Sequence, residues 1–439
     1  MPLTPQLQAV WRTVRYGRFS RSVGVLAGAS AIAQGVSVLA SPLLTRLYTP
    51  ADFGVLAVFT ALLSVGGVIA CLRFESAIPV PVEDHAARSV LHLALVVAVG
   101  MASLSALVVW ASGERLAAAF DIAGHAGLLW LLPLGVLLMG SYEALSRWAV
   151  RVRDFSTLAR TKLMRSASAV TVQVGLGVAV SGSPVWLVLG SIAGQSAGIL
   201  TLARRLQPTS PPPRAGEAPG LLATASRYRR FPLLSAPSGV LNTVTLHAPT
   251  VIIAATFGPI VAGLYALTQR VLGLPMVLLG TAISDVFLGD AAAARRAGDL
   301  ERLRTLFSRT VVVLTVASVT IVGGVALVAP SAFAFVFGDT WREAGEFVRA
   351  LAPMYAMGFV AAPFGGLLAV LERQDLFLFR EITRAGLVIG SLAIAQVLGA
   401  TPLQSMTALG LAGAVGYLTY ILVSWSALAA HGRRPGRGA

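Results

Sequence analysis

The sequence predicts an all-α polytopic membrane protein with about twelve transmembrane helices, arranged as two groups of six. Three observations lead to this prediction. The 439-residue chain is 56% hydrophobic and 12% charged, with a mean hydropathy of +0.77, so polar surface is too scarce for a water-soluble globule. The apolar residues form runs of about 20. The basic residues lie almost entirely on one side of the series that these runs form.

Each apolar run is long enough to cross the ~30 Å hydrocarbon layer as a helix. The runs are continuous and do not alternate with polar residues, which favours helices over the strands of a barrel. The first six predicted spans are 22–44, 53–72, 89–110, 127–148, 163–180 and 185–203. The second six are 233–257, 261–288, 310–329, 347–371, 383–398 and 403–429.

The distribution of basic residues predicts the orientation. With a cytoplasmic N-terminus, 29 of the 34 Lys+Arg residues lie in the inside segments or in the span ends beside them. Four lie outside (Arg46, Arg115, Arg342 and Arg349), and Arg270 lies within a span. Adding or removing one helix would disrupt this pattern, so both termini are predicted to be cytoplasmic. Topology and attraction to anionic membrane lipids then account for the net charge of +15, and no loop is long enough for a nucleic-acid-binding module.

A Pro- and Gly-rich break divides the spans six and six. The predicted parts are a basic interfacial segment 1–21, an N-terminal lobe 22–203, a cytoplasmic linker 204–232, a C-terminal lobe 233–430 and a basic tail 431–439. An even number of spans per lobe predicts a parallel repeat, related by an axis along the membrane normal. A trace of this repeat is the shared spacing of Pro50, Gly54 and Ala57 with Pro259, Gly263 and Ala266.

Prolines within the spans are candidate hinges. A proline in a helix removes one backbone hydrogen bond and clashes with the preceding turn, so the helices that contain Pro42 and Pro249 should bend. Pro275 is a third candidate hinge. Membrane helices also tolerate prolines without any functional role.

The composition argues against several kinds of site. Cys71 is the only cysteine, the five histidines are scattered and Lys162 is the only lysine. An intrachain disulfide and a multi-thiolate metal site are therefore excluded, and the chain contains no phosphate-binding loop for ATP hydrolysis and no recognisable hydrolase motif. We expect no bound cofactor and no metal. A proton or sodium gradient remains a candidate energy source.

Arg270 is the strongest candidate for a functional residue. A cation at the middle of a membrane helix costs at least ~2.5 kcal/mol. Asp285, the nearest acid in the same predicted span, lies 15 residues away, or about 22 Å along the axis. Arg270 therefore requires an acid on another span, an aqueous cavity or a bound anion, and its planar fork is well suited to phosphate.

The other charges near the spans leave more than one interpretation open. Arg46 and Arg73 lie at span ends, where either can extend to the interface. Glu143 and Arg147 are four residues apart and are expected to pair. Glu75, Glu143 and Asp285 are the candidates for ion coupling.

Uncharged polar residues also occur within the spans. Gln34, Asn242, His247 and Gln269 are candidates for contacts with sugar hydroxyls. Hydrogen bonds between helices are the alternative for each of them, as for Gln173 and Gln195.

Three segments resemble polysaccharide flippases of the Wzx type. They are SPLLTRLYTPADFG at 41–54, LRFESAI at 72–78 and AGLYALTQRVLGLP at 262–275. This places the chain near the multidrug/oligosaccharidyl-lipid/polysaccharide exporter superfamily, which implies two six-helix lobes around a central cavity. The resemblance also implies that Arg46, Arg73 and Arg270 bind pyrophosphate, because related lipid II flippases carry functional arginines in the corresponding helices.

The resemblance implies alternating-access translocation of an undecaprenyl-pyrophosphate-linked oligosaccharide across the bacterial cytoplasmic membrane, for O-antigen, capsule or exopolysaccharide assembly. A polysaccharide polymerase and chain-length proteins are candidate partners. Two alternatives remain. A drug or cation antiporter of the same superfamily would be expected to use buried acids, and a membrane glycan polymerase or ligase would be expected to have a larger outer loop.

Overall fold

The computed structural model describes residues 24–180, 182–205, 220–276, 280–371 and 373–431. The predicted interfacial segment 1–21 and nearly all of the predicted tail 431–439 lie outside this range. The described part of the chain is helical and contains no strand.

The helices of the first half are Gly24–Leu47, whose last part is α2 (Ser41–Leu47), then α3 (Pro50–Ile69), α4 (Asp84–Ala119), α5 (Leu131–Arg151), α6 (Phe155–Val180) and α7 (Pro184–Arg205). Those of the second half are α8 (Leu221–Arg227), α9 (Ala236–Pro275), α10 (Thr281–Arg296), α11 (Leu300–Phe337), α12 (Arg342–Ala361), α13 (Leu367–Val370), α14 (Gln374–Val397) and α15 (Pro402–His431). Short 3-10 or π turns include η1 (Phe74–Ala77), η3 (Phe231–Ser235) and η6 (Ala362–Gly366).

The helices confirm the predicted fold class. Within the described residues, 10 stretches are long and apolar enough to cross a membrane. The longest of them, Phe231–Gly273, contains Gly258 at φ 78° and ψ −178°, which is not helical and divides the stretch into two spans. Together with the 24-residue helix α14, this gives the twelve spans that the sequence predicts.

Several predicted boundaries were wrong. The span predicted at 261–288 ends with α9 at Pro275, and residue 288 belongs to the separate helix α10. Proline supplies no backbone N–H to continue the ladder, and π-type turns follow it at Met276. The span predicted at 383–398 starts earlier, because α14 begins at Gln374 and includes charged residues that a hydropathy window excludes. The predicted linker 204–232 contains α8.

Backbone contacts divide the chain into two compact units. Unit 1 comprises residues 1–48 and 58–246, and unit 2 comprises residues 49–57 and 247–439. The division therefore falls inside α9, beyond the predicted linker. The first part of α9 belongs to unit 1 because it packs there, with Gly239 against the side chain of Arg73.

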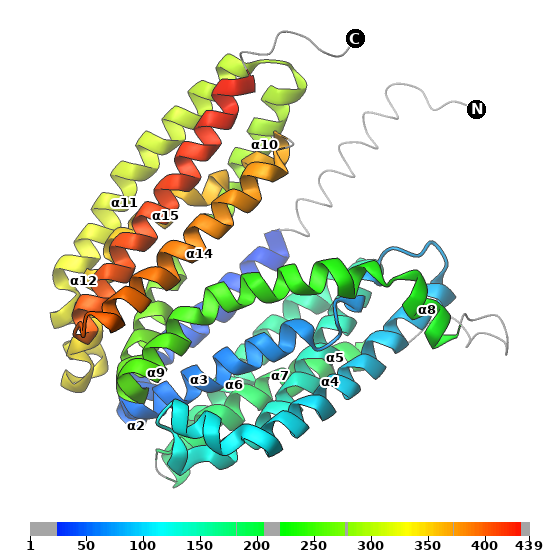
Figure 1. Ribbon diagram of the computed structural model, residues 1–439, viewed down its shortest axis with the longest axis vertical. Helices are drawn as coiled ribbons and strands as arrows, with labels where there is room; N and C mark the ends of the chain where they lie inside the picture. The colour runs from blue at the N-terminus through cyan, green and yellow to red at the C-terminus, as the bar shows by residue number, and fades with distance from the viewer. Residues whose placement is uncertain (1–23, 181, 206–219, 277–279, 372, 432–439) are drawn as a thin grey trace. The chain divides into compact units, whose positions relative to one another are not determined.

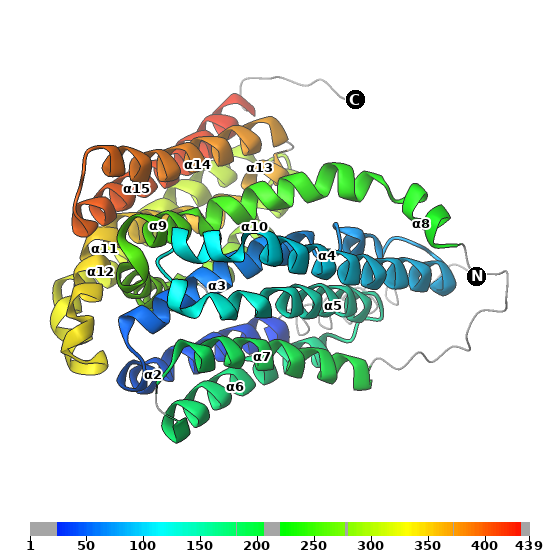
Figure 2. The same ribbon diagram turned by 60° about the horizontal axis from the view of Figure 1, so that its bottom comes forward.

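In unit 1, α4 packs on α5, α5 on α7, and α6 runs side by side with α7 (Figure 2). The core at one end of the unit combines small residues with aromatic ones, including Phe74, Ala94, Ala98, Ala144 and Trp148. Small side chains at these contacts let membrane helices approach closely.

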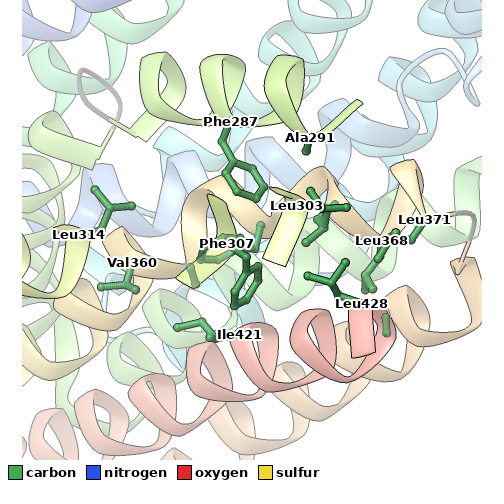
Figure 3. Close-up of a cluster of buried hydrophobic side chains, with 14 of the residues drawn as sticks. Phe287, Ala291, Leu303, Phe307, Leu314, Val360, Leu368, Leu371, Ile421 and Leu428 are labelled. Atoms are coloured by element: carbon green, nitrogen blue, oxygen red, sulfur yellow. The ribbon is translucent and has the colours of Figure 1, made fainter. Parts of the chain in front are cut away.

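In unit 2, α12 contacts both α11 and α15, and α15 also contacts α14 (Figure 1). One buried cluster joins residues of α10, α11, α12, η6, α13 and α15 (Figure 3). The rings of Phe287 and Phe307 both pack on Phe364, with centroids 5.0 Å and 4.2 Å apart.

The predicted repeat corresponds to a symmetric helix crossing within unit 2. A side chain at Gly54 of α3 would overlap the carbonyl of Pro259 in α9, and one at Gly263 would overlap the carbonyl of Pro50. Each glycine therefore lies against the proline of the other motif. The shared spacing is explained by this backbone-to-backbone contact, which only glycine permits.

The predicted hinges differ in their local backbone. Pro42 lies in the first turn of α2, and Ala40 just before it keeps right-handed helical angles, φ −75° and ψ −18°. Pro249 lies within a continuous helical stretch, because Gly258 is the residue of α9 with non-helical angles. Pro275 ends α9, and its side chain is outside the described part of the structure.

Candidate functional site

Arg270 lies in the second part of α9, where the helix is fixed on both sides. The Thr268 hydroxyl donates hydrogen bonds to the carbonyls of Leu264 and Ala344, both at 2.9 Å, which joins α9 to α12. The Gln269 amide donates to the hydroxyl of the buried Tyr265 at 2.6 Å. The backbone that carries Arg270 is therefore well anchored.

The guanidinium of Arg270 has no counter-charge among the described residues. No hydrogen bond or ion pair joins it to any of them, and the side chain is partly exposed. The interpretation that Arg270 forms a structural ion pair with another span is thus not supported within this part of the chain. Because α9 ends at Pro275, Arg270 lies five residues, or about 7.5 Å, from the end of its helix and not at the middle of a span as the sequence predicted. A cation in a membrane helix without a partner requires water or an anion.

Arg73 lies at the turn that follows α3, in an unusual backbone conformation. Leu72 and Arg73 have φ values of 48° and 64°, in the left-handed region that non-glycine residues rarely occupy. Such a conformation costs on the order of 1–3 kcal/mol and persists where other contacts hold it. Its effect is to place the Arg73 guanidinium beside Gly239 of α9 and 3.7 Å from the Glu75 carboxylate.

The predicted ion pair between Glu143 and Arg147 is not formed among the described contacts. Both charges act instead on the buried carboxyl of Glu75, which also lies next to Arg73. Burial raises the pKa of Glu75 above its ordinary value of 4.5, Arg73 and Arg147 oppose this, and Glu143 adds to it. Two acids and two arginines thus form one charge cluster at the end of unit 1. We call these four residues the Glu75 cluster.

The two other charged candidates are Arg46 and Asp285. Arg46, in the last turn of α2, is exposed and forms no hydrogen bond or ion pair with a described residue. Asp285 lies in α10, but its side chain is outside the described part of the structure. Its predicted role in ion coupling therefore stays a prediction.

The sugar-contact candidates lie in different places. Gln34 lines a cavity of about 330 Å³ in unit 1, between the helix Gly24–Leu47, α6 and α7. Lys162 and Arg165 line the same cavity, which we call the α6–α7 cavity. Asn242 is exposed and His247 partly exposed on α9, and Gln269 is partly exposed and bonded to Tyr265. Gln173 is structural, because its amide donates to the carbonyl of Leu187 at 2.9 Å.

Sequence analysis missed a buried charge network in unit 2. Glu381 of α14 lies 3.3 Å from the guanidinium of Arg380 and 3.3 Å from that of Arg384, and it accepts a hydrogen bond from the Tyr420 hydroxyl. Arg380 is only 1% exposed and stacks on the Tyr420 ring, 3.6 Å from its centroid. The i, i+1, i+4 charge pattern within a helix that continues into an apolar run was the available signal.

No group of three or more potential metal ligands lies together in the described ranges. The charged candidates instead form separate features: Arg270 without a partner, the Glu75 cluster, the α6–α7 cavity and the Glu381 network.

Sequence comparisons relate the chain to polysaccharide biosynthesis proteins. A family model described as polysaccharide biosynthesis protein matches residues 43–346, which is more than half of the chain. The lipopolysaccharide biosynthesis protein WzxC of Escherichia coli K12 is 26% identical over 186 residues, covering 42% of this chain and 37% of WzxC. The matched region thus spans well under two thirds of that relative.

Several solved membrane-protein structures have a similar fold. An inward-facing multidrug resistance MATE family transporter superposes with a TM-score of 0.74 at 13% identity, covering 92% of this chain and 96% of its own. The lipid II flippase MurJ, in an inward closed conformation, gives 0.68 at 12% identity, with coverages of 91% and 87%. A MOP superfamily transporter from Pyrococcus furiosus, described as having a binding pocket of reverse polarity, gives a TM-score of 0.60 at 14% identity, with coverages of 94% and 96%. At these identities the likeness establishes the fold.

Proposed function

Because the chain belongs to the polysaccharide biosynthesis protein family and has the fold of a multi-pass membrane transporter, we propose that it translocates an undecaprenyl-pyrophosphate-linked oligosaccharide across the bacterial cytoplasmic membrane. The observation that carries the proposal is the guanidinium of Arg270, embedded in a membrane helix without a counter-charge among the described residues.

The physical problem is the headgroup of the substrate. Moving an anionic, hydrated pyrophosphate and its sugars through hydrocarbon is prohibitive, because their hydrogen bonds to water are lost. A cationic aqueous cavity lowers this barrier, and the prenyl tail stays in lipid. Arg270 supplies a planar bidentate donor for the pyrophosphate. Arg73 and Arg46 are proposed to bind the same group earlier or later along the path.

The Glu75 cluster is our proposal for energy coupling. Burial holds the pKa of Glu75 above its ordinary value, so this carboxyl exchanges its proton closer to neutral pH than a solvated one. The proton is bound below the raised pKa and released as the pH rises through it. Glu75→Gln is expected to flatten the pH dependence of translocation, and an unchanged pH profile would rule out this coupling site.

The proposed cellular location and partners rest on the predicted topology and on the family of the chain. Both termini face the cytoplasm, and the glycan is delivered to the outer leaflet for O-antigen, capsule or exopolysaccharide assembly. A polysaccharide polymerase and chain-length proteins are the proposed partners on that side.

The test is reconstitution of the full chain into vesicles with fluorescently labelled lipid-linked oligosaccharide. Arg270→Ala is expected to slow translocation at least about tenfold, because it removes a charge-assisted bidentate contact. Arg270→Lys, which keeps the charge and loses the fork, should be intermediate. Arg115→Ala is the matched control, since Arg115 is an exposed arginine on α4. Parent rates for both Arg270 variants would reject the anion-site proposal, and dye efflux without glycan movement would indicate a drug antiporter.

A further inference from the structure

The α6–α7 cavity is lined by polar side chains and has no acid among its lining residues. Four serines, two glutamines, Lys162 and Arg165 face it, from the helix Gly24–Leu47, α6 and α7. Its volume of about 330 Å³ is in the range of small-ligand sites. All of these residues belong to unit 1.

Two cations of α6 line this cavity. α6 has 26 residues and is about 39 Å long, so Lys162 and Arg165 lie about 10 Å and 15 Å along its axis. The Lys162 ammonium donates to the Ser30 hydroxyl at 2.6 Å, and the Arg165 guanidinium lies 4.2 Å from the centroid of the Tyr142 ring. Neither forms an ion pair with a described residue.

The cations are held in place by the packing of α6 on α7. A side chain at Gly194 would overlap the carbonyl of Arg165, and one at Gly198 would overlap its side-chain stem. The glycines of α7 thus let α6 approach and fix the direction of Arg165. On the opposite wall, the Ser166 hydroxyl donates to the carbonyl of Ala33 at 2.7 Å.

A second observation points to a ligand. Gln195 is 7% exposed and lines the cavity, and its side-chain oxygen has no hydrogen-bond partner. A buried amide oxygen without a donor costs about 1–3 kcal/mol. The cavity therefore combines two cations that have no acid beside them among the described residues with an amide oxygen that has no hydrogen-bond donor, and this combination suits an anion that also carries a hydroxyl or amide donor.

From this combination we propose that the α6–α7 cavity binds an acidic sugar of the transported glycan, with its carboxylate on Lys162 and Arg165 and a hydroxyl on Gln195. The required chemistry is a hydroxyl-bearing anion. Gln34, with an amide that both donates and accepts, is well placed to contact a further hydroxyl. This inference deepens the proposed function, on which it rests, by naming the class of glycan.

The test is direct binding to the full chain in nanodiscs of zwitterionic phosphatidylcholine. Saturation-transfer NMR compares sodium glucuronate with glucose, which has the same ring and no carboxylate. Glucuronate should bind at least about tenfold more tightly, because two charge-assisted contacts are lost with glucose. Lys162→Gln and Arg165→Gln should each remove about tenfold of the glucuronate affinity, and Gln195→Leu a smaller factor for both sugars.

The control variant is Arg160→Gln. Arg160 is exposed on α6, so this change removes the same charge from the same helix outside the cavity. Equal affinities for the two sugars, or an equal loss in Arg160→Gln, would overturn the proposal. A second arm adds phosphatidylglycerol to the nanodiscs. If this lipid displaces glucuronate, a lipid headgroup occupies the site and the sugar assignment is wrong.

The acidic-sugar proposal and the proposed function can each fail without the other. Translocation of a neutral lipid-linked glycan together with no glucuronate binding would reject the acidic-sugar site alone. Glucuronate binding in a protein that translocates no lipid-linked glycan would reject the proposed function.

Discussion

Two pairs of cations on helices differ in whether an acid of the protein lies beside them. Lys162 and Arg165 on α6 lie three residues apart, and Arg380 and Arg384 on α14 lie four apart. In each pair an arginine lies over a tyrosine ring, at 4.2 Å for Arg165 and 3.6 Å for Arg380. The second pair has the carboxylate of Glu381 within 3.3 Å of both guanidiniums, whereas the first has no ion pair with a described residue.

The difference separates structural cations from cations available to a ligand. In the Glu381 network one carboxylate lies between two guanidiniums and so offsets part of their charge within unit 2, and Arg380 is almost fully buried. The cations of the α6–α7 cavity line an accessible volume and lack that neutralisation. Arg270 likewise has no acid beside it among the described residues. A counter-charge supplied by the protein thus indicates a role in folding, and its absence indicates a role in binding.

The largest effect is expected where the neutralising acid is removed. Glu381→Gln deprives the buried guanidinium of Arg380 and the partly buried one of Arg384 of their carboxylate and should lower the free energy of unfolding by about 3–5 kcal/mol. Thermal or denaturant unfolding in detergent measures this change. The matched control is Glu346→Gln, which breaks the more exposed pair with Arg349 and should cost under about 1 kcal/mol. Equal effects in the two variants would contradict the comparison.

A smaller effect is expected where an acid is introduced. Ser30→Asp places a carboxylate beside the Lys162 ammonium, which now lies 2.6 Å from the serine hydroxyl. It should raise the free energy of unfolding by about 1 kcal/mol and weaken glucuronate binding about tenfold, because the protein then supplies the counter-charge. Ser30→Ala serves as the control, since it removes the hydroxyl without adding charge. Unchanged glucuronate affinity in Ser30→Asp would count against the binding role.

The smallest effect is expected where an unpaired cation is replaced. Lys162→Met keeps an unbranched side chain, one atom shorter than that of lysine, and leaves no ion-paired acid behind. The free energy of unfolding should stay within about 1 kcal/mol of the parent or rise slightly. Unfolding under the conditions used for Glu381→Gln measures this, and a loss as large as in that variant would show that Lys162 is structural.

Much of the fold could be predicted because lipid imposes simple rules. Continuous apolar runs located the spans, and the one-sided basic residues gave their number. The break at Gly258 and the spacing shared by Gly54 and Gly263 also correspond to structural features. Boundaries failed where helices carry charges that the protein itself neutralises, as at the start of α14, where Arg380 and Glu381 were counted as part of a loop.

The candidate site was less predictable, because a sequence does not show which side chains share a space. Arg270 was identified because its own helix offers no nearby acid. Glu143 and Arg147 form no ion pair with each other among the described residues, and both instead influence the carboxyl of Glu75 in the turn after α3. Lys162 lies one residue before a predicted span and was grouped with the inside charges, so its place in a cavity became visible only with α7 beside it.

The most direct test of the account is the affinity of the purified protein for an undecaprenyl-pyrophosphate-linked oligosaccharide, measured with and without Arg270. Native mass spectrometry in detergent can titrate the lipid against the parent, Arg270→Ala and the exposed control Arg115→Ala. The account predicts at least about a tenfold loss of affinity for Arg270→Ala and parent affinity for Arg115→Ala. Equal affinity in all three proteins would contradict the claim that an unneutralised membrane arginine holds the pyrophosphate.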